Sequence, residues 1–363
     1  MALHIAIDAS RTTVPHPTGT EVYALELIRA LIEQNTAHRL TLYFRDQPPD
    51  GLFPPSEHVA YCVIPSRRLW THVRFAAALT RHRPDLTFVP AHTLPLLFPG
   101  RAIVTVHDLG YRLFPAAHPP FQRWYLDRTT RHSARRADMI FADSQATADD
   151  LGRFYGVNAD KIQVVYPGVH PPEYNDVDVV ARYNLPERYF LFIGTLQPRK
   201  NIAGIVAAYR AYRERVDDPA GLVLAGGKGW LYDERWTVGV PGLHLPGYID
   251  EADKAHLYAN AVALVFPSFY EGFGFPVVEA MHIGLPVIVS NTSSLPEIVG
   301  DAGLTVSPDD PFQIAGAMIR IESDYDLRDQ LCEAGYRRVR QFHWERAARR
   351  VLALFEHVGQ GKA

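Results

Sequence analysis

The sequence has few cysteines and no long apolar run. Only Cys62 and Cys332 are cysteines among its 363 residues, and they stand far apart, without the paired spacing of a zinc site or a disulfide framework. The N-terminal MALHIAIDASR is too short an apolar run for a signal peptide, and no stretch approaches the roughly 18 apolar residues of a membrane span. We therefore expect a cytoplasmic protein that is either soluble or bound to a membrane surface.

A strong charge of either sign is also absent. The formal net charge is −3, whereas a nucleic-acid-binding domain usually has a large, clustered excess of Lys and Arg, so no nucleic-acid partner is expected. Hydrophobic residues make up 47% and charged residues 21% of the sequence, which is the composition of a globular protein. A chain of this length exceeds one ordinary core and predicts two domains.

The motifs of several enzyme classes are missing. HIAIDASRTT lacks the glycines of a dinucleotide-binding turn, and Gly226-Gly227-Lys228-Gly229 does not match a P-loop, which disfavours a dehydrogenase or an NTPase. No His, Cys or Asp cluster has metal-ligand spacing. Asp176-Val177-Asp178 has the Asp-x-Asp pattern of metal-dependent sugar-nucleotide enzymes, but it lies away from any expected strand end. We therefore expect no metal and no cofactor.

Apolar strand-like runs alternate with amphipathic stretches along the chain, which is typical of a parallel sheet in a doubly wound α/β fold. The expected strands are 4–7, 40–44, 102–108, 139–144, 161–168, 189–193, 221–227, 261–268 and 285–291. Helices are expected after Thr18-Gly19-Thr20, over 276–284 and over 342–358. The expected division is a first domain at 1–167, a linker at 168–180, a second domain at 181–341 and a C-terminal helix at 342–363 that crosses back to the first domain.

The segment FPSFYEGFGFPVVE contains two carboxylates, Glu271 and Glu279, eight positions apart. Glu271 follows a buried strand, where doubly wound folds bind their ligands, and Glu279 lies in the next helix. Gly272 and Gly274 allow backbone amides to approach a ligand, and a helix N-terminus favours an anion such as phosphate. The alternative is a packed turn with two surface glutamates.

A second candidate region is GTLQPRKN, which starts at Gly194 and contains Arg199 and Lys200 after another apolar strand. A reaction that releases a diphosphate needs fixed cations where negative charge develops. Arg can bind two oxygens at once, and Lys supplies a compact charge. The alternative is a solvated basic loop.

The first domain contains fewer candidate site residues. His107 stands at the end of an apolar strand, which favours a ligand role, although a lone His is more often structural. Thr18-Gly19-Thr20 at the start of the first helix is a candidate phosphate nest and is weak evidence by itself.

Together these residues resemble retaining glycosyltransferase family 4, whose members have the GT-B fold of two Rossmann-like domains facing across a cleft. The resemblance covers nearly the whole chain and includes His107-Asp108, Glu271-Gly272-Phe273-Gly274 with Glu279, LPGYIDEADKAHLYANA and the 342–344 entry to the last helix. It implies catalytic roles for His107, Arg199, Lys200 and Glu271. It implies donor binding by Gly19, Thr20, Gly194, Tyr248, Ile249, Phe273, Gly274, Phe275 and Glu279.

The implied reaction is metal-independent transfer of a hexose, with retained configuration, from a nucleotide diphosphate sugar to a glycan or lipid-linked acceptor. GTLQPRKN is similar to a subgroup that uses GDP-mannose in polysaccharide assembly, which favours GDP-mannose over a UDP-sugar. Thr195 stands where many relatives have Arg, so the cationic role falls on Arg199 and Lys200. The alternatives are a nucleotide-sugar epimerase of GT-B fold and a non-catalytic nucleotide-sugar-binding subunit.

The first domain also mixes basic and aromatic residues, which is typical of proteins that contact an anionic membrane. These residues are Arg67, Arg68, Trp70, Arg74, Arg112, Phe121, Arg123, Trp124, Arg128, Arg131, Arg135 and Arg136. One hypothesis is peripheral contact with the inner face of the membrane, and the alternative is ordinary solvated helices.

Overall fold

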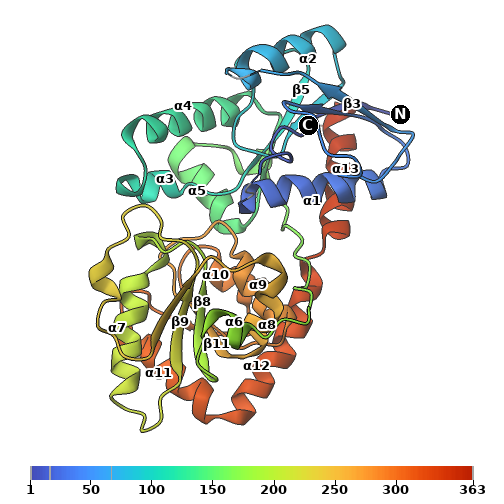
Figure 1. The fold of residues 1–363 in the computed structure, drawn as a ribbon. Coiled ribbons are helices and arrows are strands. Elements are labelled where there is room, and N and C mark those ends of the chain that lie inside the picture. Colours follow the sequence, from blue (N-terminus) through green and yellow to red (C-terminus); the bar gives the residue numbers. More distant parts are fainter. Residues whose placement is uncertain (1, 16–17, 67, 362–363) are drawn as a thin grey trace. The chain divides into compact units, whose positions relative to one another are not determined.

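A computed structural model describes the chain except residues 1, 16, 17, 67, 362 and 363. The chain forms two compact units, coloured along the sequence in Figure 1. Unit 1 comprises residues 1–113, 119–168 and 342–363, and unit 2 comprises residues 114–118 and 169–341. Within the expected linker, regular structure resumes at α6 (Val179–Tyr183).

Unit 1 contains a seven-stranded parallel sheet in the order β3-β2-β1-β4-β5-β6-β7. Its strands are β1 (His4–Asp8), β2 (Arg39–Phe44), β3 (Val59–Val63), β4 (Leu86–Val89), β5 (Arg101–Val106), β6 (Met139–Ala142) and β7 (Ile162–Val164). Its main helices are α1 (Gly19–Gln34), the π-helix η1 (Trp70–Phe75), α2 (Ala76–His82), α3 (Gly110–Leu113), α4 (Pro120–Arg136), α5 (Gln145–Tyr155) and α13 (Trp344–Gly359).

The sheet of unit 1 has a core on each face, because successive strand side chains point to opposite sides. Ile5 and Ile7 pack with buried residues of α1 and α13, whereas Ala6 faces the cluster that contains residues of η1, α2, α4 and α5. Among the α13 side chains, Val351 and Phe355 are fully buried. The C-terminal segment is therefore part of the core of unit 1.

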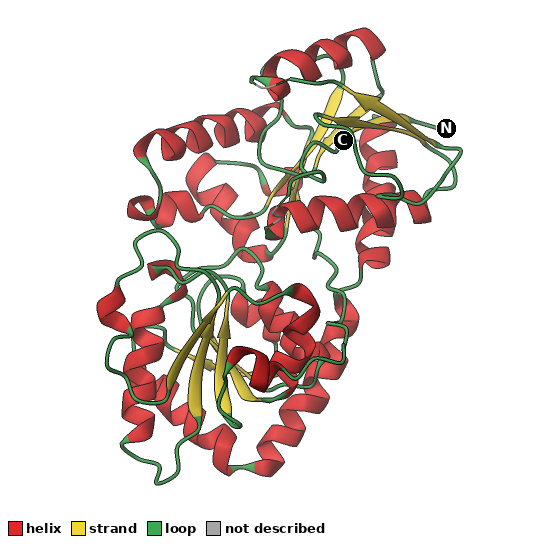
Figure 2. Cartoon of the chain, in the orientation of Figure 1, coloured by secondary structure: helices red, strands yellow, loops and turns green. Residues whose placement is uncertain are grey.

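Unit 2 contains a six-stranded parallel sheet in the order β10-β9-β8-β11-β12-β13. Its strands are β8 (Tyr189–Ile193), β9 (Gly221–Ala225), β10 (Leu243–Gly247), β11 (Ala261–Phe266), β12 (Val287–Ser290) and β13 (Gly303–Val306). Its main helices are α7 (Ile202–Arg213), α8 (Lys254–Ala259), α9 (Phe275–His282), α10 (Leu295–Val299), α11 (Pro311–Ser323) and α12 (Tyr325–Arg338). Figure 2 shows helices on both sides of this sheet, with α7 packed against α11 and α9 against α10 and α12.

The expected α/β class with two doubly wound parallel sheets is confirmed. Several strand ends differ from the expectation: β5 stops at Val106, so His107 lies in the following loop, and β7 covers only Ile162–Val164. Among the described residues, no helix is both long and apolar enough to cross a bilayer.

Candidate active site

The charged side chains predicted for the site in unit 2 lie at the carboxyl edge of its sheet. β8 and β11 are neighbours, but the chain leaves β8 towards β9 and leaves β11 towards β12, on opposite sides. Such a reversal of strand order opens a crevice at the strand ends, where doubly wound folds bind ligands. The loop after β8 contains Arg199 and Lys200, and the loop after β11 contains Glu271. The structure therefore brings these three predicted residues to the switch point.

Glu271 forms ion pairs with both predicted cations. Its Oε1 lies 2.6 Å from Lys200 Nζ, and its Oε2 lies 3.2 Å from Arg199 Nη1. A second link joins the two loops, because the Phe269 amide donates to the Arg199 carbonyl over 2.9 Å. The alternative in which Arg199 and Lys200 form a solvated basic loop is wrong, because both side chains are largely buried beside Glu271.

Glu271 is only 6% exposed, yet its pKa is lowered and not raised. Burial by itself raises the pKa of a carboxyl, but the positive charges of Lys200 and Arg199 outweigh this effect and lower the pKa of Glu271 below its ordinary value. A buried carboxylate between two cations is thus charged at neutral pH. It offers an acceptor for hydroxyl groups, and the cations beside it attract an anionic ligand.

The loop that follows Glu271 is fixed by buried serines. The Ser294 hydroxyl lies 2.9 Å from the carbonyl oxygens of both Glu271 and Phe273, and the Glu271 amide donates to Ser293 Oγ over 2.9 Å. Gly274 has φ +113°, a conformation that favours glycine, and a Cβ there would lie 2.8 Å from Leu295 Cδ2. The backbone conformation therefore favours glycine where the loop turns into α9.

Glu279, the second predicted carboxylate, lies on α9 with its own partners. Tyr258 donates a hydrogen bond of 2.6 Å to its Oε2, and Lys254 Nζ lies 3.3 Å from its Oε1. Burial lowers the pKa of Lys254, but the charges of Glu279 and Glu251 outweigh it and raise that pKa. Lys254 and Tyr258 were not predicted as site residues, although both lie in the segment that resembles the family.

The remaining predicted residues of unit 2 lie on the loops at this same edge. Gly194 directly follows β8, has φ +140° and donates its amide to the Ala225 carbonyl over 2.9 Å. After β10, Tyr248 is exposed and Ile249 is buried. Phe273 and Phe275 flank Gly274, with ring centroids 5.2 Å apart.

In unit 1, His107 is buried and hydrogen-bonded at both ring nitrogens. Nδ1 lies 2.8 Å from Asp143 Oδ2, and Nε2 lies 3.3 Å from the Pro90 carbonyl oxygen. Burial lowers the pKa of His107, but the charge and hydrogen bond of Asp143 outweigh it and raise that pKa. Tyr23 packs edge-on against the imidazole, with ring centroids 4.7 Å apart.

Asp143 is the partner that was not predicted for His107, and the signal for it in the sequence is limited to the fact that both residues end apolar runs of expected strands. Val106 and Ala142 are paired in the register of β5 and β6, so the next residues on the two strands, His107 and Asp143, stand side by side. His92 Nε2 accepts a hydrogen bond of 3.2 Å from the His107 amide, and the two imidazole centroids lie 5.6 Å apart. Burial and the neighbouring His107 lower the pKa of His92 to about 4, so this second ring is neutral at pH 7.

Gly19 and Thr20 form the first turn of α1, as predicted for a helix start. The Thr18 amide donates to Glu21 Oε2 over 3.1 Å, and Arg11 pairs with Glu21 Oε1 at 2.9 Å. A carboxylate of the chain thus lies at the N-terminus of α1, and phosphate binding there stays a prediction.

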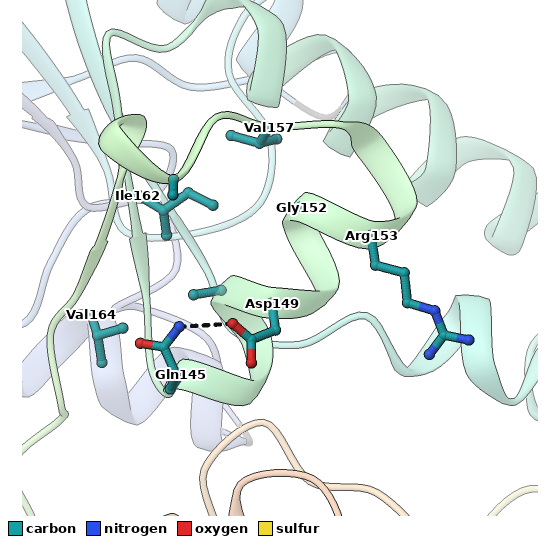
Figure 3. A pocket seen from close by; sticks show the side chains of 9 residues that line it. Gln145, Asp149, Gly152, Arg153, Val157, Ile162 and Val164 are labelled. Carbon is teal, nitrogen blue, oxygen red and sulfur yellow. Dashed lines mark hydrogen bonds between the residues drawn. The ribbon is translucent and has the colours of Figure 1, made fainter.

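Two further features are the carboxylate of the Asp-x-Asp pattern and a hollow in unit 1. The Asp178 carboxylate caps α6 by accepting from the Ala181 amide over 3.1 Å, and the described residues contain no His, Cys, Asp or Glu group that could hold a metal. A hollow of about 500 Å³ lies between α5 and β7, with Gln145, Asp149 and Arg153 on its rim (Figure 3). None of the predicted site residues lines this hollow.

Two family models match the chain: one described as Glycosyltransferase Family 4 over residues 17–172, and one described as Glycosyl transferases group 1 over residues 179–338. The chain therefore belongs to glycosyltransferase family 4 and is a glycosyltransferase. The two models meet in the segment between the two sheets, so each unit corresponds to one of them. The resemblance inferred from the motifs is therefore confirmed.

The curated relatives include mannosyltransferases. The O-antigen chain mannosyltransferase B of Escherichia coli is 31% identical over 93% of this chain and 96% of that protein. The serotype-specific mannosyltransferase WbdA of Escherichia coli is 26% identical over 92% of this chain, which spans 46% of that protein. Among solved structures, a sucrose-phosphate synthase from Thermosynechococcus elongatus matches with a TM-score of 0.74 and 24% identity, over 98% of this chain and 99% of that one. That similarity shows the fold.

Proposed function

We propose that the protein transfers mannose from GDP-mannose to a growing glycan or a lipid-linked acceptor in polysaccharide synthesis. The observation that carries the proposal is the buried Glu271 between Lys200 and Arg199 at the switch point of unit 2. Such a triad suits a ligand that combines a diphosphate with sugar hydroxyls, because the cations bind phosphate oxygens and the carboxylate accepts from hydroxyls.

The roles of individual residues follow from the chemistry of the triad and from the family resemblance. Arg199 and Lys200 bind the diphosphate, Glu271 binds the sugar hydroxyls, and the amides of 273–275 contact sugar and diphosphate. Glu279 binds the ribose hydroxyls, with its carboxylate held in place by Lys254 and Tyr258. The backbone at Tyr248 and Ile249 binds the base. From the family resemblance we expect Gly194, Gly19 and Thr20 to contact the phosphates and His107 to act near the anomeric carbon.

Mannose as the transferred sugar is supported by the relative that is 31% identical over nearly the full length of both proteins and is a mannosyltransferase. GTLQPRKN supports the same donor through its similarity to a subgroup that uses GDP-mannose. That relative is an O-antigen chain mannosyltransferase, which also supports an O-antigen-like glycan as acceptor. Both cysteines are free, and we place the reaction in the cytoplasm, at the inner face of the membrane.

For the chemical step we propose front-face substitution with retention of configuration. The acceptor oxygen bonds to the anomeric carbon on the side from which the diphosphate leaves, and its proton passes to the departing phosphate oxygen. The protein contributes orientation and fixed positive charge, so no divalent metal is needed to stabilise the leaving group.

A screen of sugar nucleotides for protection against thermal unfolding tests the donor, because a ligand that binds the native state raises Tm by mass action. We expect GDP-mannose to raise Tm more than UDP-glucose or UDP-galactose at equal concentration. Incubation with GDP-mannose and an acceptor should then yield free GDP and a mannosylated product. A product that is an isomer of the nucleotide sugar, without GDP, would identify an epimerase instead.

A further inference from the structure

The N-terminal half of α4 is exposed all round. All six residues from Pro120 to Tyr125 are exposed, and the buried residues of α4 are Thr129, Thr130, Ser133 and Ala134, in its C-terminal half. Phe121 is 75% and Trp124 56% exposed, with their rings stacked at 5.9 Å. A surface helix normally turns its large apolar side chains to the core. Here they are exposed instead, on the helix labelled α4 in Figure 1.

The π-helix η1 extends this apolar surface. His72 Nε2 lies 3.2 Å from the Tyr125 hydroxyl, which places η1 beside the start of α4. Leu69, at the start of η1, is 67% exposed and has φ +53°, a conformation that is strained for a residue with a Cβ, and Val73 is also exposed. We call Leu69, Val73, Phe121, Trp124 and Tyr125 the apolar tip of unit 1.

The charges around the apolar tip are almost all positive. Residues 66–83 contain no Asp or Glu, and Asp127 is the only acidic residue of 110–136. Asp127 already pairs with Arg112 at 3.2 Å and with Arg131 at 3.6 Å. Arg68, Arg74, Arg123 and Arg128 are exposed, and the Arg128 guanidinium lies 6.0 Å from the Trp124 ring centre. Arg67 lies outside the described residues.

The apolar tip lies towards the carboxyl edge of the sheet in unit 1. η1 comes after the carboxyl end of β3, and α4 comes after the carboxyl end of β5, by way of α3. In a parallel sheet these ends share one edge, and His107 follows β5 at that edge. A surface to which the apolar tip is anchored therefore lies near the edge that contains His107.

We propose that the apolar tip inserts into the headgroup region of an anionic membrane, with Arg68, Arg74, Arg123 and Arg128 held against the lipid phosphates. Exposed Trp and Phe side chains lose water-facing apolar area in that region, and arginines gain from the negative surface potential. Aromatic rings surrounded by cations match this environment in both polarity and charge. The inference rests on the proposed lipid-linked acceptor, which such docking would bring to the carboxyl edge of unit 1.

Vesicle binding of the full chain tests the proposal. We expect the protein to co-sediment with vesicles of phosphatidylcholine and phosphatidylglycerol, to bind phosphatidylcholine vesicles at least tenfold more weakly, and to dissociate in high salt. The double variant F121S/W124S should lose at least fivefold in binding to anionic vesicles, and R123Q/R128Q should lose binding and salt dependence together.

Matched controls come from unit 2. Phe312 and Tyr325 are 63% and 70% exposed, and arginine side chains lie over both rings, as Arg128 does over Trp124. F312S/Y325S, and R337Q/R340Q at two other exposed arginines, should bind vesicles like the unsubstituted protein. Equal losses in the controls, full binding by F121S/W124S, or no binding by the unsubstituted protein would each overturn the proposal.

Transfer assays separate this proposal from the proposed function. F121S/W124S should transfer mannose to a water-soluble acceptor at the unsubstituted rate and be slower only with a vesicle-embedded acceptor. Absence of transfer by the unsubstituted protein to either acceptor would contradict the proposed function, whatever the vesicle binding. Equal rates of the variant and the unsubstituted protein on the vesicle-embedded acceptor would contradict docking through the apolar tip.

Discussion

Replacing Lys200 with Ala removes one of the two cations that we assign to the leaving diphosphate. As the sugar–phosphate bond breaks, the diphosphate gains about one negative charge, and two unit charges about 4 Å apart interact by roughly 4 kcal/mol at an effective dielectric constant of 20. A cation at this position therefore contributes about 3–4 kcal/mol more in the transition state than in the ground state. Since each ~1.4 kcal/mol is a factor of ten, kcat should fall by about a hundredfold to a thousandfold.

The same substitution also affects folding, because it leaves the buried Glu271 with Arg199 alone. Burial, which raises the pKa of a carboxyl, is then opposed by one cation instead of two, so the pKa of Glu271 should rise. We expect a loss of about 1–3 kcal/mol in the free energy of unfolding. Each kcal/mol lowers Tm by about 2–4 °C for a domain of this size, so the variant stays folded at assay temperature if the parent Tm is ordinary.

The assay is release of nucleotide diphosphate under single-turnover conditions, which reports the chemical step, beside a thermal unfolding curve of each variant. Arg210→Ala is the matched control, because it removes the same charge from an exposed position on α7 of unit 2. Lys200→Arg should lose less than Lys200→Ala, since it keeps the charge and changes only its geometry. Turnover of a folded Lys200→Ala within tenfold of the parent would refute the role assigned to Lys200.

Three further predictions concern metal dependence, a pKa and a backbone conformation. EDTA should leave the transfer rate unchanged, and inhibition that is reversed by Mg²⁺ or Mn²⁺ would contradict a metal-free site. Asp143→Asn should lower the pKa of His107, because burial then acts without the opposing carboxylate; NMR titration of the ring measures it, with Asp149→Asn as a surface control. In the parent, protonated His107 stabilises the fold, and this contribution is fully present below pH 6.5 and is lost as the pH rises through the folded-state pKa. A free energy of unfolding that does not change with pH above 6.5 would contradict the raised pKa of His107. Gly274→Ala should cost about 1–3 kcal/mol of stability because of its φ of +113°, whereas Gly316→Ala, in an open helical position of α11, should gain about 0.5–1 kcal/mol; equal effects in denaturant unfolding would argue against strain at Gly274.

Most of the fold was predictable because the central strands are continuous apolar runs. YFLFI and AVALVF can be read directly as buried parallel strands, and the loops after them contained the cations and Glu271. Four strands were not predicted, for different reasons. β3 has exposed residues at its centre and lies at a sheet edge, and β10 contains Pro246, which edge strands tolerate. β4 (LTFV) and β13 (GLTV) are short, and a threonine interrupts the apolar run in each.

The partners of the site residues were harder to predict, because they depend on which strands and helices become neighbours. Asp143 lies 36 residues after His107 and meets it only through the pairing of β5 with β6. Lys254 meets Glu279 because α8 and α9 come together in unit 2. Local patterns indicate which loops contain charge, whereas the pairing of strands decides which charges neutralise one another.

The contribution of α13 to unit 1 has a consequence for the order of events during synthesis. Trp344, Val351 and Phe355 complete the core around β1 and β4, yet they leave the ribosome after every residue of unit 2. Unit 2 is contiguous from Val169 to Gln341, apart from the short segment 114–118, and can fold as soon as it has emerged. The first strands of unit 1 are synthesised earliest, but one apolar face of its sheet stays uncovered until α13 has been synthesised. A nascent chain stalled before Trp344 should therefore contain a protease-resistant unit 2 and a protease-sensitive unit 1.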